Sequence, residues 1–393
     1  MNKAKLISVS KDTICYLTCL SPLAFSMAVC FDQGEIIATM FACLAILFAP
    51  IKRKKIMPVY LSFMLLWYAS VAFDMGVTFW ACILCGILLI ISSFFFEKLI
   101  KLFSAPTVSG VMLATALSST VLFTTHYFGI GAKGNTVMEM IDSYISLGFH
   151  PNWRGVLYGT IVMVIMITFP RKFKKLTKTV SPAFIAIVST LIINLFLNPS
   201  DMVTAINEIH DGTKWQAYLS FLPAKAAFSF SLSFENILAV ISIAAALFIT
   251  YFHSIAGIKD TSKKDILVSG IANAVSGGVF RLPFPYGINK NKGSFLPRIL
   301  AASIMFLMFY FGEKTMLRIP VHSCAVVIIV GAWQSVKWDN LKKVFTGVTP
   351  VLCFVVCVLA CLITDLVYGI IISFLISVLY SCFLSKLKVF EKS

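Results

Sequence analysis

Apolar residues along the chain form long runs that are separated by short polar stretches. A helix that crosses a bilayer needs about 17–25 mainly apolar residues, and fewer where helices are broken. By this measure the pattern predicts about fourteen spans. They cover residues 13–31, 35–50, 56–73, 77–96, 105–125, 154–170, 179–198, 236–258, 266–280, 282–294, 299–312, 319–335, 347–363 and 366–385. The sequence therefore predicts an all-α polytopic membrane protein.

Composition supports this fold class. The 393 residues are 59% hydrophobic and 13% charged, whereas soluble domains average about 45–50% and about 25%. A water-soluble fold of this length cannot bury so much apolar surface, which excludes soluble enzymes, disordered chains and disulfide scaffolds. The 11 cysteines lie mostly inside apolar runs. This placement indicates small buried side chains rather than a redox or zinc site.

The net charge of +16 is carried by basic residues that lie between the apolar runs. If the N-terminus is cytoplasmic, the cytoplasmic segments hold all but seven of the 33 lysines and arginines. The seven exceptions are Lys133, Arg154, Lys214, Lys225, Arg281, Lys314 and Arg318. The positive-inside rule then predicts two cytoplasmic termini and an even number of crossings. We expect a multi-pass protein of the cell (inner) membrane, with the lipid bilayer and not nucleic acid as its partner.

Proline and glycine interrupt several of the predicted spans. Pro22 lies within the first span, Pro58 opens the third, and Pro283, Pro285 and Gly287 break the tenth. Non-helical backbone at membrane depth is tolerated where it lines a cavity, and paired broken helices in two halves of a chain are typical of transporter substrate sites. The breaks in spans three and ten therefore favour a transporter. Enzymatic signature motifs are absent from the sequence, so we expect no enzyme activity.

Five stretches resemble the SulP family of inorganic anion transporters. They are SPLAFSMA at 21–28, LFSAPTVSGVMLATAL at 102–117, ILVSGIANAVSGGVFRLPFP at 266–285, RIPVHSCAVVIIVGAWQSVKWDNLKKVF at 318–345, and Ile363-Thr364-Asp365-Leu366 with Gly369-Ile370. Each stretch is weak alone, but all five occur in the family's order and at the corresponding spans.

The resemblance implies a fold and a function. The fold has about 14 transmembrane spans in two inverted 7-helix repeats, with core and gate domains and broken helices 3 and 10. We place the transport domain at 12–386, with repeats at 12–198 and 233–386, and expect no soluble C-terminal domain. Family members are commonly dimeric and move sulfate, bicarbonate or chloride by an elevator motion. We therefore expect a homodimeric secondary transporter of a small inorganic anion, without a cofactor, coupled to H⁺ or Na⁺. A separate STAS-type chain is the expected regulator.

The resemblance also implies which residues surround the anion, because family members hold it between half-helices three and ten, beside spans one and eight. The matching positions are Ser26, Pro58, Val59, Tyr60, His253, Tyr286, Gly287, Ile288, Asn289 and Lys290. His253 stands where the family usually carries an acidic residue.

Two of these residues have two interpretations each. His253 either couples protons to anion movement or is a neutral core histidine. Lys290 either faces the anion or belongs to a cytoplasmic loop with Lys292. Two alternative functions also remain open: a nucleobase permease of the same architecture, or a membrane subunit that kept the fold without transporting.

Overall fold

The computed structural model describes residues 3–31, 65, 75–134, 136–197, 233–255, 262–275, 295–316, 318–336 and 338–390. Its longer helices are α1 (Lys3–Phe31), α4 (Met75–Ser92), α6 (Ala105–Phe128), α7 (Val137–Leu147), α8 (Trp153–Lys172), α9 (Pro182–Leu197), α12 (Phe234–Ile255), α13 (Lys263–Val275), α14 (Phe295–Met316), α15 (Val321–Ser335), α17 (Val348–Ile363) and α18 (Leu366–Phe390). Short helical pieces are η1 (Ser93–Phe95), α5 (Phe96–Leu99), η2 (Ile100–Leu102), η3 (Leu176–Lys178) and α16 (Trp338–Val344).

The helices follow the predicted spans closely. Within the described ranges, four helices are long and apolar enough to cross a bilayer, and five more are apolar but shorter. No described residue lies in a β-strand, so the all-α prediction is confirmed. Helix α17 (Val348–Ile363) differs by one residue from the predicted span 347–363. Predicted spans two, three and ten lie outside the described residues, apart from Leu65.

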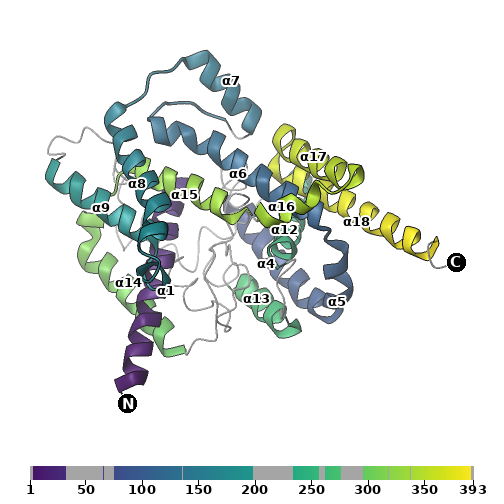
Figure 1. Ribbon diagram of the computed structural model, residues 1–393, viewed down its shortest axis with the longest axis horizontal. Helices are drawn as coiled ribbons and strands as arrows, with labels where there is room; N and C mark the ends of the chain where they lie inside the picture. The colour runs from purple at the N-terminus through teal and green to yellow at the C-terminus, as the bar shows by residue number, and fades with distance from the viewer. Residues whose placement is uncertain are drawn as a thin grey trace.

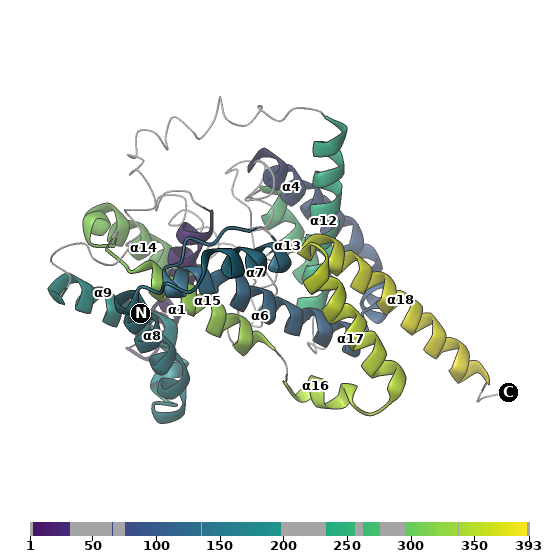
Figure 2. The ribbon, with the colours of Figure 1, turned by 90° about the horizontal axis from the view of Figure 1, so that it is seen from above.

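Helix pairing repeats along the chain. In the first half α1 packs on α9 and α8 on α9, and in the second half α12 packs on α18 and α17 on α18. Contacts between the halves also occur in equivalent pairs. The contact of α1 with α14 corresponds to that of α12 with α4, and the contact of α8 with α15 corresponds to that of α17 with α6. Helices α6 and α15 run side by side through the centre, with α8 and α9 towards one side and α17 and α18 towards the other (Figures 1 and 2). This pairing is that of two structurally equivalent repeats.

Glycines allow the closest helix contacts. Helices α4 and α13 cross at Gly86 and Gly270, where a Cβ on Gly86 would lie 2.5 Å from the Ala274 nitrogen. In α8, a Cβ on Gly159 would lie 2.5 Å from the Tyr127 ring of α6. Membrane helices lack a hydrophobic driving force between them, so small residues that permit close backbone contact stabilise their association.

Two features differ from the simplest interpretation of the sequence. Pro22 lies inside α1, and this helix continues through it from Lys3 to Phe31. The stretch 126–153, which lies between two predicted spans, contains helix α7. Its N-terminus is capped by the Thr136 hydroxyl, which accepts a hydrogen bond from the Glu139 nitrogen (3.2 Å).

The α4–α13 crossing generates a stability prediction. We expect Gly86→Ala to destabilise the protein by about 1–3 kcal/mol, because the added methyl group meets backbone atoms that cannot move aside. Thermal unfolding in detergent measures the effect. The matched control is Gly131→Ala, since a Cβ on Gly131 meets no atom within 4 Å. Equal transition temperatures for the two variants would show that the helices do not cross this closely.

Candidate functional site

Ser26 is one of two predicted site residues that the structure describes. It lies four residues after Pro22 in α1 and is 1% exposed. Its hydroxyl donates to the carbonyl of Pro22 (2.8 Å) and lies 3.4 Å from the carbonyl of Cys324 in α15. Ser26 therefore lies where α1 meets α15, one of the two central helices.

His253 lies in the last turn of α12 and is fully buried. Its Nδ1 donates to the Ile249 carbonyl one turn earlier (3.1 Å). The imidazole meets the edge of the Phe103 ring, with centroids 5.2 Å apart and planes at 86°. The His253 ring thus lies against a residue just before α6.

Phe103 connects His253 to a wider aromatic cluster. Its ring stacks on Phe252 of α12 (5.3 Å) and contacts Phe374 of α18 (5.1 Å). Phe252 also contacts Phe96 (6.3 Å) and Phe248 (4.9 Å). This aromatic cluster thus joins α12 to the start of α6 and to α18. A charge that formed on His253 would lie directly at this contact.

A network of hydroxyl groups fixes the start of α6 beside Phe103. The Ser377 hydroxyl of α18 donates to the Leu102 carbonyl (2.7 Å) and accepts a hydrogen bond from the Ser104 nitrogen (2.7 Å). The Thr107 hydroxyl lies 2.9 Å from the same Ser377 oxygen. One serine of α18 therefore satisfies several backbone and side-chain groups where α6 begins.

A hydrogen bond from the preceding half also fixes the start of α15. Asn194 of α9 donates its side-chain N–H to the Arg318 carbonyl (2.8 Å). Arg318 and Leu102 each lie two residues before the N-cap residue of their helix, Pro320 and Ser104. The last helix of each half thus holds the start of a central helix, which supports the repeat described above.

His322 is a residue that sequence reasoning missed. It lies in the first turn of α15, is 1% exposed, and has no hydrogen-bond partner at either ring nitrogen within the described part of the chain. Its Nε2 lies against α8, where a Cβ on Gly155 would be only 2.0 Å away. A glycine at 155 is therefore required for this ring position. The sequence signal was an ionisable residue that follows Ile319-Pro320 at a helix start.

The remaining predicted site residues lie outside the described residues. They are Pro58, Val59, Tyr60, Tyr286, Gly287, Ile288, Asn289 and Lys290. Ser26 and His253 have different partners, on α15 and at Phe103 respectively. Their grouping around one anion stays a prediction. Among the described residues, no cluster of three or more metal-ligating side chains is present.

Known structures share this arrangement of helices. The transmembrane domain of BicA, a cyanobacterial bicarbonate transporter, superimposes with a TM-score of 0.70 at 15% identity, over 97% of this chain and 98% of that one. SLC26A9 gives 0.69 at 16% identity, over 96% of this chain and 66% of that one. Murine Slc26a9, an anion transporter in the inward-facing state, gives 0.67 at 12% identity, over 96% and 68%.

Sequence comparison alone does not detect this likeness, since neither a protein-family model nor a curated protein matches the chain. The structural likeness covers nearly the whole chain and confirms the predicted fold class. The chain has the fold of SulP/SLC26 transmembrane domains, an all-α membrane architecture.

The hydroxyl network at the start of α6 generates a further prediction. We expect Ser377→Ala to cost about 1 kcal/mol, because the partly buried Ser104 nitrogen and Leu102 carbonyl lose a partner. Ser381→Ala is the matched control on the same helix, since the Ser381 hydroxyl lies 3.5 Å from the Leu102 carbonyl. Thermal unfolding of both variants in detergent measures the difference. If the two variants were equally stable, Ser377 would not anchor α6.

Proposed function

We propose that this protein is a secondary transporter that moves a small inorganic anion of the sulfate, bicarbonate or chloride type across a membrane. The observation that carries the proposal is the likeness over 96–97% of the chain to the structures of a bicarbonate transporter and an anion transporter. Helix N-termini carry partial positive charge and free N–H groups. The breaks predicted at spans three and ten would supply such N-termini at membrane depth.

The proposed mechanism is an elevator-like alternating access between two groups of helices. One group, the core, holds α1, α4, α12, α13 and α14. The other, the gate, holds α6, α8, α9, α15, α17 and α18. The groups meet where α1 contacts α15 and α9, and where α12 contacts α18. Ser26 and the aromatic cluster around Phe103 lie at these contacts, so movement of the core would change the surroundings of both.

The proposal extends to topology and partners. The distribution of lysine and arginine supports two cytoplasmic termini in the cell (inner) membrane. The resemblance supports a homodimer, regulation by a separate STAS-type chain, and coupling to H⁺ or Na⁺. The domain bounds 12–386 and the ten predicted site residues belong to the same proposal.

A flux panel in proteoliposomes tests the function. We expect labelled sulfate or bicarbonate to accumulate above the level in protein-free liposomes, because partial positive charge at half-helix N-termini favours anions. Uracil should not accumulate, since a nucleobase needs carboxylates to accept its ring N–H groups, and we find no acidic residue in 282–294 or within 236–258. Uptake of uracil alone would establish a nucleobase permease. Absence of all flux would favour the non-transporting subunit.

His253 generates the pH prediction. Histidine ordinarily changes charge between about pH 5 and 8. A protonated His253 and a bound anion would each make the other easier to bury, so acid should tighten anion binding. A coupling of about 1.4 kcal/mol corresponds to about a tenfold change in anion affinity. We therefore expect His253→Gln to flatten the pH profile of flux. His150→Gln, which changes an exposed histidine, is the control and should keep the wild-type profile. Superimposable profiles for all three proteins would make His253 a core residue without a role in coupling.

A further inference from the structure

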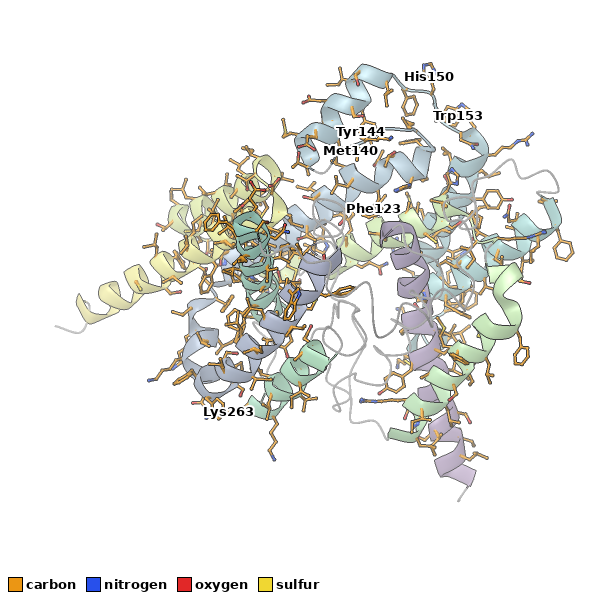
Figure 3. The ribbon with its side chains drawn as sticks, turned by 180° about the vertical axis from the view of Figure 1, so that it is seen from behind. Phe123, Met140, Tyr144, His150, Trp153 and Lys263 are labelled. Atoms are coloured by element: carbon orange, nitrogen blue, oxygen red, sulfur yellow. The ribbon has the colours of Figure 1, made fainter. Side chains whose placement is uncertain are left out.

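Helix α7 is firmly held on the end of α6 by one of its faces. Val137 and Met140 are buried, and Met140 and Tyr144 point from α7 towards Phe123 of α6 (Figure 3). The Tyr144 hydroxyl donates to the Val121 carbonyl of α6 (3.0 Å). Burial raises the pKa of Tyr144 to about 12, so the hydroxyl remains a donor at neutral pH. The orientation of α7 about its own axis is therefore fixed.

This fixed orientation leaves a second apolar side of α7 exposed. Met138 is 49% exposed and Ile145 is 76% exposed. Residues seven apart lie about two turns apart on the same side of a helix. The exposed polar residues Glu139 and Ser146, also seven apart, lie about 100° further round the helix. The exposed surface of α7 thus carries an apolar stripe, the Met138–Ile145 stripe, and a polar stripe, the Glu139–Ser146 stripe. Exposed Asp142 lies between them, about 40° round the helix from Met138.

Aromatic side chains continue the apolar surface beyond α7. Phe149 is 59% and Trp153 is 68% exposed. The Phe149 ring meets Phe128 edge-on at 5.0 Å and Trp153 at 6.5 Å. An exposed Trp at the end of a spanning helix is typical of the membrane–water interface, where the indole ring contacts both apolar chains and headgroups. The adjacent Phe149 adds apolar surface there.

Large apolar residues are also exposed along α8, which begins at Trp153. Leu157 is 60% and Val164 is 52% exposed, on a helix long and apolar enough to cross a bilayer. In Figure 1, α7 lies along the upper edge of the molecule, opposite the edge that carries the N-terminus. Exposed apolar residues therefore lie both on a membrane-spanning helix and on α7, at one end of the molecule.

From these observations we propose that α7 is an interfacial helix, whose Met138–Ile145 stripe lies in the lipid leaflet at this end of the molecule. The partner is the bilayer itself. Water would leave the large apolar side chains of Met138 and Ile145 unfavourably hydrated. An amphipathic helix in the interface buries its apolar side about 5–10 Å below the headgroup boundary, while the polar side faces water. The Glu139–Ser146 stripe is the side of α7 that remains hydrated.

This placement gives α7 a physical role. The helix joins lipid to the end of α6 through Met140, Tyr144 and the Val121 carbonyl. Helix α7 also contacts α17, so it holds the ends of two gate helices at the membrane surface. The inference depends only on insertion of the protein in a bilayer and not on the anion that it transports.

Spin labels on α7 test the proposal in the full-length protein in phosphatidylcholine liposomes. The background is a variant in which the 11 native cysteines are replaced, checked for a wild-type thermal transition. Met138→Cys and Ile145→Cys probe the apolar stripe. Glu139→Cys and Ser146→Cys are the matched controls on the same two turns. Power-saturation electron paramagnetic resonance then compares collisions with oxygen, which concentrates in lipid, and with a water-soluble nickel chelate.

We expect labels at 138 and 145 to collide mainly with oxygen, at a depth of about 5–10 Å, and labels at 139 and 146 to collide mainly with nickel. Nickel-dominated collisions at all four positions would place α7 in water and overturn the proposal. Low collision rates with both reagents at 138 and 145 would overturn it in favour of a protein partner, such as a second copy of this chain. The labels at 138 and 145 each report the surroundings of the apolar stripe independently. If one of the two variants fails to fold, the other still tests the proposal.

Discussion

The structure depends on one constraint: every backbone N–H and C=O group inside an apolar medium needs a partner from the chain itself. Helix interiors meet this requirement internally, but helix starts do not. Ser377 supplies partners at the start of α6, and Asn194 supplies one just before α15. Because each of these residues belongs to the last helix of its half, satisfying the helix starts also fixes the positions of the two central helices. The same arrangement places Phe103, which precedes α6, against His253.

The sequence predicts the spans well because bilayer thickness imposes a length and an apolar character that can be counted along the chain. It predicts the site less well. Of the predicted site residues, Ser26 and His253 lie in the described part, and their partners Cys324 and Phe103 are distant along the chain. No pattern in one sequence pairs such positions.

Two missed features show where the sequence signal was weak. Helix α7 has only 11 residues. Its apolar residues are too few to raise the average hydropathy of the stretch 126–153. The spacing of Val137, Met140 and Tyr144 was the available signal. The His322 position depends on Gly155 of another helix, and a glycine in a span predicts close packing without naming the side chain that fills the space.

The fold persists at 12–16% identity because few positions determine it. The fold needs apolar runs of bilayer length, small residues at helix crossings and polar side chains at helix starts. More than one type of residue can meet each of these requirements. The hydrogen bond before α6 comes from a serine, and the equivalent hydrogen bond before α15 comes from an asparagine. Within this one chain, two different side chains thus meet the same requirement.

The contacts between the core and the gate differ in kind from those within each group. Inside the core, Gly86 and Gly270 bring the backbones of α4 and α13 together, and inside the gate, Gly369 brings α18 against the backbone of Cys361 in α17. Backbone contacts of this kind resist sliding, since a shift of one residue places a side chain where only a glycine fits. Between the groups, by contrast, the aromatic cluster joins α12 to α18 through side chains. Side-chain rotation can remake such contacts at a new register, so this boundary is where the elevator-like movement of one group past the other would meet the least steric resistance.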